Sequence, residues 1–285
     1  MYPVERTLCP ACRSRQRGGR RTDARGGGPA RAGAAHSAGD FGRGKAHQPL
    51  PACAGCGDAC ETAPGKGCLP VKLYSSVLSP YARKVRAAIH ALGLQDRVEI
   101  INVNISASPA EVVNANPLCK IPTLLGDDGT AMYDSRVIIE YLGVVAGSDM
   151  LVPAAGMARC MVLRTQALGD GIADAAILYR GLLAAGIAPD AGPAVRQMAA
   201  VERGLAALER MARESAPDAV ARPDAGALSV GCALGFLDAR FAELGWTGQY
   251  PALAEWYARL CRVDCMRRSA SQDTAGTCPS GASYR

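Results

Sequence analysis

The sequence predicts an α/β domain followed by an all-α helix bundle, with a disordered extension in front of them. Three observations support this prediction. Strand-like and helix-like patterns alternate over residues 71–149, only helical patterns follow over residues 155–268, and residues 1–70 show no periodicity. We expect residues 269–285 to form a flexible tail, so two domains of ordinary size account for the folded part.

The extension differs from the rest in composition. Residues 1–70 hold 13 Gly and 7 Pro, and their 11 Lys/Arg against 5 Asp/Glu account for the whole net charge of +6. A Gly-rich and Pro-rich segment without a repeat is typical of disorder. The other 21 basic and 21 acidic residues cancel, so we expect no nucleic-acid partner for the folded part.

Six of the twelve cysteines lie in the extension. Cys9 with Cys12, and Cys53 with Cys56, have the Cys-x-x-Cys spacing of zinc knuckles, but a long Gly-rich and Arg-rich segment separates the pairs. Three interpretations stay open. The extension is a zinc site, a disordered segment with incidental cysteines, or translated GC-rich sequence upstream of a true start near Val71.

Hydrophobic runs in the sequence are short. None approaches the roughly 18 residues that cross a bilayer, and the N-terminus has no apolar segment between its charges. We therefore expect neither a membrane partner nor a secretory signal, and we predict a cytoplasmic protein.

The first folded segment begins with an alternating stretch, residues 71–75, which predicts a strand. Ser79 and Pro80 then stand where the N-cap and first residue of a helix would stand, and helical spacing continues to Gly93. Residues 98–103 predict a second strand.

Residues 106–116 predict a short helix and a loop. Two short strands then flank Gly126-Asp127-Asp128-Gly129, a strong hairpin signal, and Asp134 with Ser135 opens another helix. The resulting order, β-α-β-α-β-β-α, is that of a thioredoxin-like domain. We expect a linker over residues 143–156.

The second half shows helical spacing throughout. The predicted helices cover residues 157–183, with a possible break near Gly169, and residues 195–213, 225–244 and 250–261. Asp224 can cap the third of these, although Ala227 leaves its capping box incomplete.

Three stretches of the first half carry a family resemblance: Ser79-Pro80-Tyr81-Ala82-Arg83-Lys84, Asn116-Pro117-Leu118-Cys119-Lys120-Ile121-Pro122-Thr123-Leu124, and Asp134-Ser135. In this order and spacing they resemble cytosolic glutathione transferases, most closely the bacterial members, over roughly residues 71–265. The resemblance implies a homodimeric detoxification enzyme that joins glutathione, as co-substrate and without a cofactor, to hydrophobic electrophiles. The alternative is a non-catalytic binding or regulatory member of the same fold.

Ser79 is the predicted catalytic residue. A free thiol has a pKa of about 8.5, and a helix start offers unpaired N–H groups and a positive dipole end that favour the thiolate. A hydrogen bond donated by the Ser79 hydroxyl would add to this effect. The alternatives are a plain N-cap at Ser79 and a catalytic role for Ser76. Tyr81 could also reach the site, although an aromatic residue after the proline more often serves packing.

The resemblance also implies the glutathione contacts. A cis peptide bond before Pro122 would present the backbone of Ile121 to the cysteinyl residue of glutathione, and Lys120 would pair with its glycyl carboxylate. Ser135 suits the γ-glutamyl carboxylate at a helix N-terminus, and Asp134 suits the ammonium group. A solvated lysine and a simple helix cap are the alternative interpretations.

The scarcity of cysteine at the helix start and of histidine in the folded region limits the reactions that the site can carry out. Ser79 and Ala82 stand where a dithiol site would need cysteines, and His90 is the single histidine of the folded region, so we expect neither thiol–disulfide exchange nor a catalytic metal. Cys119 replaces the glycine usual in the family, either as a tolerated substitution or as a thiol near the bound sulfur. Asp170 and Asp174 face the cleft, the dimer interface or solvent, and Tyr179 with Arg180 are candidates for the pocket wall.

Overall fold

The computed structural model describes residues 71–126, 128–216 and 220–270. The predictions made for residues 1–70, including the zinc site, and for most of the tail lie outside these residues. All the elements described below belong to one compact unit.

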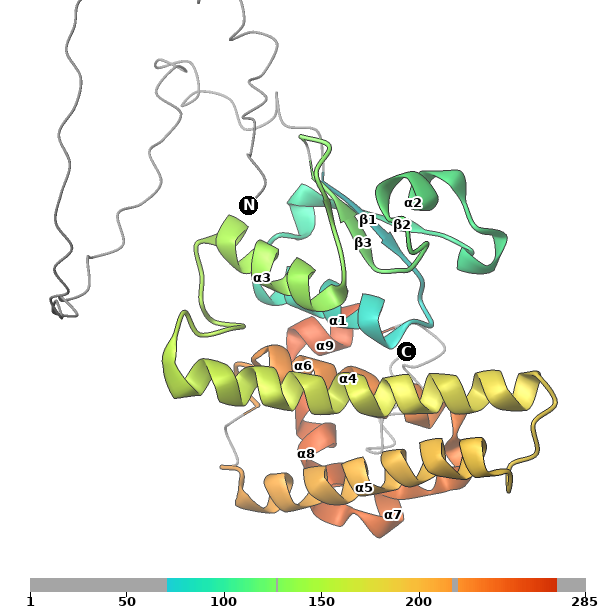
Figure 1. The fold of residues 1–285 in the computed structure, drawn as a ribbon. Coiled ribbons are helices and arrows are strands. Elements are labelled where there is room, and N and C mark those ends of the chain that lie inside the picture. The colour runs from blue at the N-terminus through green and yellow to red at the C-terminus, as the bar shows by residue number, and fades with distance from the viewer. Residues whose placement is uncertain (1–70, 127, 217–219, 271–285) are drawn as a thin grey trace, which may run out of the picture. The chain divides into compact units, whose positions relative to one another are not determined.

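A four-stranded mixed sheet forms the core of the first half (Figure 1). Its strands are β1 (Val71–Ser75), β2 (Val98–Asn102), β3 (Thr123–Leu125) and β4 (Ala131–Met132), in the order β2-β1-β3-β4. The β1 strand runs parallel to β2 and antiparallel to β3, and the predicted hairpin joins β3 to β4.

Three helices complete this half: α1 (Pro80–Ala91), α2 (Ala110–Ala115) and α3 (Ser135–Ala146). The predicted order of strands and helices is therefore confirmed, and with it the thioredoxin-like fold. Two details differ from the prediction. A separate short turn, Ile105–Ala107, precedes α2, and α3 extends into the segment that was predicted as a linker.

The second half is entirely helical in the described residues. It contains α4 (Gly156–Ala184), α5 (Gly192–Glu214), α6 (Ala225–Arg240), α7 (Trp246–Gln249), α8 (Pro251–Cys261) and α9 (Asp264–Ser269). The short helices α7 and α9 were not predicted. In Figure 1, α1 and α3 lie between the sheet and the long α4, and α5 lies on the other side of α4.

The sequence left a break near Gly169 open, but α4 has none there, because it runs as one helix of 29 residues. A Cβ atom on Gly169 would lie 2.7 Å from the backbone nitrogen of Val230 and 2.8 Å from the carbonyl carbon of Ser229. The glycine therefore allows α4 and α6 to approach closely. It marks a helix crossing rather than a helix end.

The α6 helix is the buried centre of the second half. Asp224 caps it by accepting a hydrogen bond from the backbone nitrogen of Ala227 at 2.8 Å. Among the described residues, no single helix is both long and apolar enough to cross a membrane; α6 and the bent segment that follows it meet those criteria only as a pair, by length and composition.

The α1 helix joins the two halves. It packs against α3 on one side and against α6 and α9 on the other. Arg86 donates to Ser75 Oγ at 2.7 Å, to the carbonyl of Ser76 at 3.0 Å and to the carbonyl of Ser269, at the end of α9, at 3.3 Å. These bonds fix the loop between β1 and α1, and this loop leads directly to Ser79.

Candidate functional site

A cavity of about 660 Å³ lies between the two halves. Its first wall consists of the β1–α1 loop, the segment before β3 and the start of α3, and its second wall comes from α4 and α6. The structure brings all six predicted site residues to this cavity: Ser79, Lys120, Ile121, Pro122, Asp134 and Ser135. Their roles in binding and catalysis stay predictions.

Ser79 is the N-cap of α1, and Pro80 occupies the first turn. The Ser79 hydroxyl oxygen accepts a hydrogen bond from the backbone nitrogen of Ala82 at 3.2 Å. Because this bond uses a lone pair of the oxygen, the hydroxyl hydrogen can still be donated to a ligand. The plain cap and the proposed thiolate stabiliser are therefore compatible functions of one side chain.

The two neighbouring serines differ in position. Ser75 is fully buried and accepts a hydrogen bond from Arg86, so it lies away from the cavity. Ser76 lines the cavity together with Ser79 and stays the alternative hydroxyl.

The segment before β3 is held by a buried amide. Asn116 donates to the carbonyl of Lys120 at 3.1 Å and to Thr123 Oγ1 at 3.0 Å, and its own Oδ1 accepts from the backbone nitrogen of Leu118 at 3.0 Å. Thr123 also donates to the Lys120 carbonyl at 2.7 Å. The Ile121–Pro122 peptide bond is cis, as expected. Asn116 and Thr123 therefore fix the loop that presents Lys120 and Ile121.

Cys119 has a φ of +46°, in the left-handed region. This conformation explains why the family usually has glycine here, because an L-residue pays a steric penalty there. Cys119 also lines the cavity.

The start of α3 forms the third part of the first wall. Asp134 caps the helix by accepting from the backbone nitrogen of Arg136 at 3.0 Å, and Ser135 is only 3 % exposed. The unpaired N–H groups of this helix start thus lie at a cavity that Ser135 also lines.

A buried charge cluster links both walls. Lys84 Nζ donates to the two carboxylate oxygens of Asp170 at 2.6 and 2.9 Å, Arg136 Nε donates to Asp170 at 2.9 Å, and Ser229 Oγ donates to it at 2.7 Å. Asp170 therefore has three partners, from α1, α3 and α6. It is 3 % exposed, so the interpretation as a solvated acidic face is wrong for this residue.

The pKa values of the cluster follow from its geometry. Burial alone would raise the pKa of Asp170, but Lys84, Ser229 and Arg136 together hold it below its ordinary value. Burial lowers the pKa of Lys84, whose Nζ is bound to Asp170 alone among the described residues. Three donors, from Lys84, Arg136 and Ser229, thus favour the carboxylate form of Asp170.

The second wall carries further polar groups. The Tyr81 hydroxyl donates to Asp174, and Tyr81 lines the cavity, so the alternative that Tyr81 reaches the site is the one the structure favours. Burial and this hydrogen bond raise the pKa of Tyr81. Arg180 lines the cavity as predicted, but Tyr179 does not: its ring packs against Phe241 with centroids 6.1 Å apart. Arg240, which the sequence analysis did not identify, also lines the cavity.

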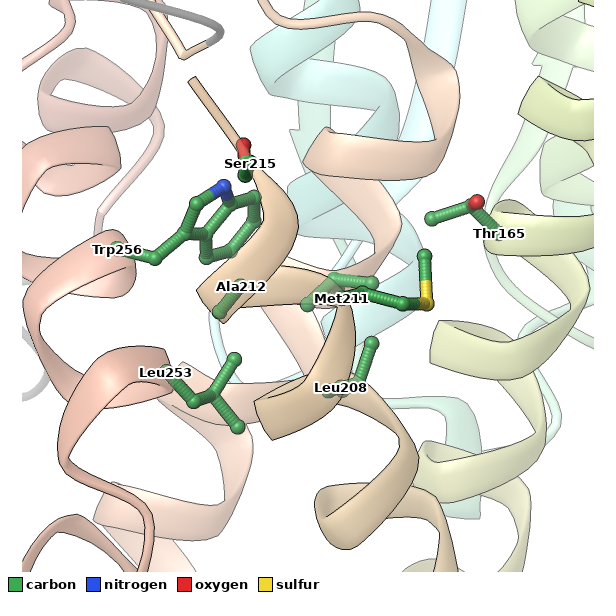
Figure 2. Close-up of a pocket in the computed structure, with 8 residues that line it drawn as sticks. Thr165, Leu208, Met211, Ala212, Ser215, Leu253 and Trp256 are labelled. Carbon is green, nitrogen blue, oxygen red and sulfur yellow. The ribbon is translucent and has the colours of Figure 1, made fainter. Parts of the chain in front are cut away.

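A second cavity, of about 100 Å³, lies inside the helical half (Figure 2). Figure 2 shows Trp256 and Leu253 facing Met211 and Ala212 across it, with Thr165 on the opposite side of Met211. None of its lining residues is titratable. Within the described ranges there is also no group of three or more His, Cys, Asp or Glu side chains that could hold a metal ion.

Comparison with known families gives two matches. The description "Glutathione S-transferase, N-terminal domain" matches residues 78–144, and "Glutathione S-transferase, C-terminal domain" matches residues 171–259. Among curated proteins, the "Uncharacterized GST-like protein YibF" of Escherichia coli K12 is 27% identical over 210 residues, which is 70% of this chain and 98% of that protein.

Solved structures show the same relationship. A glutathione transferase family member from Pseudomonas fluorescens Pf-5 with bound glutathione is 37% identical, with a TM-score of 0.64, and the match covers 70% of this chain and 98% of that one. The same comparison with its S-(propanoic acid)-glutathione complex gives 36% identity, a TM-score of 0.59 and coverages of 70% and 96%. A glutathione S-transferase from Methylobacillus flagellatus KT, also with glutathione, is 35% identical, with a TM-score of 0.62 and coverages of 70% and 98%.

Proposed function

The chain belongs to the glutathione transferase family, and from this premise we propose that it conjugates the thiolate of glutathione to electrophiles. One observation carries the proposal. The hydroxyl of Ser79 caps α1 at the edge of the cavity and keeps its hydrogen free for donation. Glutathione and a glutathione conjugate bound in the Pseudomonas relative support the same ligand here.

In this proposal the first wall binds glutathione. The backbone N–H and C=O of Ile121 pair with the cysteinyl residue, as in an added strand. Lys120 pairs with the glycyl carboxylate. Ser135 and the N–H groups at the start of α3 bind the γ-glutamyl carboxylate, while the Asp134 carboxylate attracts the ammonium group.

The chemical role of Ser79 follows from the ionisation of the thiol. The nucleophile is the thiolate, which is a minor species at neutral pH for a thiol with a pKa of about 8.5. A hydrogen bond from Ser79 and the positive end of the α1 dipole stabilise the charged form and lower the pKa of the bound thiol. The sulfur then attacks the electrophilic carbon of the second substrate.

Replacement of Ser79 tests the proposal. Ser79→Ala removes one hydrogen bond to a charged sulfur, a loss of about 1.5–3 kcal/mol, so we expect kcat to fall about 10- to 100-fold while glutathione binding persists. Thiolate absorbance of the bound glutathione should give a higher pKa in this variant. Ser76→Ala is the matched control; if it instead causes the loss of activity, Ser76 is the catalytic hydroxyl.

A non-catalytic member of the family is the competing function. Calorimetry of glutathione binding together with a conjugation assay separates the two possibilities. Binding without conjugation of any electrophile in a chemically diverse panel would favour a binding or regulatory role. Absence of binding would overturn both versions of the glutathione site.

We also propose a cytoplasmic homodimer that serves detoxification. Four large apolar side chains on α3 and the start of α4 are exposed: Val137 (46%), Val144 (73%), Met157 (74%) and Met161 (43%). Burial of such side chains against a second copy is favourable. Light scattering of the purified chain and of Val144→Glu tests this: dimeric and monomeric masses, respectively, are expected.

A further inference from the structure

Two arginines on the second wall are unpaired among the residues that the structure describes. Arg180 lies on α4 and Arg240 is the last residue of α6, and both line the cavity. Within the described part of the chain, neither makes an ion pair or a side-chain hydrogen bond. Every other charged residue that lines the cavity has a partner or a place in the proposed glutathione site.

The remaining charges can be assigned one by one. Asp170 is neutralised by Lys84 and Arg136, and Asp174 accepts a hydrogen bond from Tyr81. Lys120 and Asp134 are assigned to the two ends of glutathione. Beyond the glutathione site and the Asp170 cluster, the charged residues that line the cavity are therefore two arginines and a single carboxylate, Asp174, and this balance of charge favours an anionic ligand.

Apolar side chains stand next to these arginines. Ile177 and Leu178 precede Arg180 by less than one turn and are 39% and 50% exposed, and Phe236 lies one turn before Arg240. Leu78, beside Ser79, is 43% exposed. A ligand that fits this wall has an apolar body and an anionic group.

The position of Arg240 links this wall to the reacting sulfur. Besides the main cavity, Arg240 lines a small recess together with Leu78, Ser79 and Pro80. A group bound by Arg240 would therefore belong to a molecule that lies beside the proposed thiolate. The planar guanidinium group suits a carboxylate, which it can bind through two parallel hydrogen bonds.

We propose that the second substrate is an aromatic or aliphatic electrophile that carries a carboxylate, and that Arg180 and Arg240 bind this carboxylate. The inference rests on the proposed function and names the substrate class of the same site. In the reaction with an aryl chloride, the thiolate sulfur forms a bond to the ring carbon, the carbon–chlorine bond breaks, and chloride leaves with the electron pair.

A pair of electrophiles that differ in one charge tests the inference. The probes are 4-chloro-3,5-dinitrobenzoate and its methyl ester, with the full chain and glutathione. We expect kcat/KM, corrected for the uncatalysed rate of each probe, to be at least about tenfold higher for the carboxylate. Arg180→Gln and Arg240→Gln should each lower this ratio severalfold, and the double variant should bring it close to one.

Arg164→Gln is the matched control, because Arg164 is an exposed arginine of α4 that does not line the cavity. In this variant the ratio of kcat/KM for the carboxylate to kcat/KM for the methyl ester should equal that of the unmodified chain. Equal kcat/KM values for the two probes, or a ratio that the double variant leaves unchanged, would overturn the inference.

A binding measurement keeps the two proposals distinguishable. The products of the two probes, the carboxylated glutathione conjugate and its methyl ester, are titrated by calorimetry. If neither probe is turned over but the carboxylated conjugate binds about tenfold more tightly, and this preference is lost in the double variant, conjugation fails while the anion site stands. Equal affinities for the two conjugates would overturn the anion site.

Discussion

Lys84 of α1 donates to both carboxylate oxygens of Asp170 of α4, with side-chain exposures of 1% and 4%. The two residues come from different halves of the chain. Through Arg136 and Ser229 the same carboxylate reaches α3 and α6. Both helix starts that form the proposed glutathione site, those of α1 and α3, are therefore tied to one buried carboxylate.

Removal of one partner of this ion pair should be costly. Asp170→Asn leaves the buried Lys84 without its counter-charge, so we expect the free energy of unfolding to fall by about 3–5 kcal/mol in urea titrations. Lys84→Met should cost less, because Arg136 and Ser229 still bind Asp170. The variant that combines Asp170→Asn and Lys84→Met should lose less free energy of unfolding than the sum of the two single losses.

An exposed ion pair is the control for this experiment. Glu255 pairs with Arg259 on α8 with its side chain 75% exposed. We expect Glu255→Gln to change stability by no more than about 0.5 kcal/mol. Similar costs for Asp170→Asn and Glu255→Gln would contradict the structural role of the buried pair.

Two glycines of α4 should respond to the same substitution with opposite signs. Gly169→Ala places a Cβ atom within 2.8 Å of the α6 backbone, so we expect a loss of about 1–3 kcal/mol or more. Gly171 has no heavy atom within 4 Å of the added Cβ, so Gly171→Ala should raise stability by about 0.5–1 kcal/mol. Thermal unfolding of both variants checks the pair, and equal effects would rule out the close crossing.

Cys119 offers a test of backbone strain. Because its φ is +46°, Cys119→Gly should raise the free energy of unfolding by up to about 1 kcal/mol. Cys119→Ala removes the thiol but keeps a side chain in the left-handed region, so it should bring no such gain. If the alanine variant is stabilised as much as the glycine variant, the thiol and not the backbone is the source of the effect.

Asp238 should make stability depend on pH. Its Oδ1 accepts from Trp246 Nε1 at 2.7 Å, while Oδ2 is buried without a partner among the described residues. Burial raises the pKa of Asp238 from 3.8 to about 6, against the opposing influence of the Trp246 bond and of Arg83. The folded state then binds this proton more tightly than the unfolded chain does, so its contribution to stability rises as pH falls through 6.

Urea titrations at two pH values measure this contribution. Between pH 7 and pH 5, Asp238 should add about 1 kcal/mol to the free energy of unfolding, and Asp238→Asn should lack this increment. Fluorescence of Trp246, isolated by Trp256→Phe, should titrate with a midpoint near 6. If Asp238→Asn keeps the full pH dependence of stability, another group is responsible for that dependence.

Features that depend on neighbouring residues were predictable from the sequence. The caps at Ser79, Asp134 and Asp224 are local hydrogen bonds between residues two or three positions apart, and all three form as expected. The hairpin between β3 and β4 is also encoded locally, by its turn residues.

Features that depend on distant residues were not predictable. Lys84 and Asp170 are 86 positions apart, and no periodic pattern shows that two charged side chains will be buried together. Gly169 looks like a helix breaker until α6 lies against it. Arg240 is the last residue of a helix whose sequence indicates only a buried structural role. The packing of the two halves is what brings Arg240 to the cavity.

The buried cluster around Asp170 has a consequence for recombination between relatives. A gene that joins the first half of this chain to the helical half of another member of the family separates Lys84 and Arg136 from Asp170 and Ser229. Such hybrids inherit an uncompensated cation at the domain junction unless the donor brings an equivalent carboxylate and hydroxyl. These four positions are thus expected to be exchanged as one block or not at all.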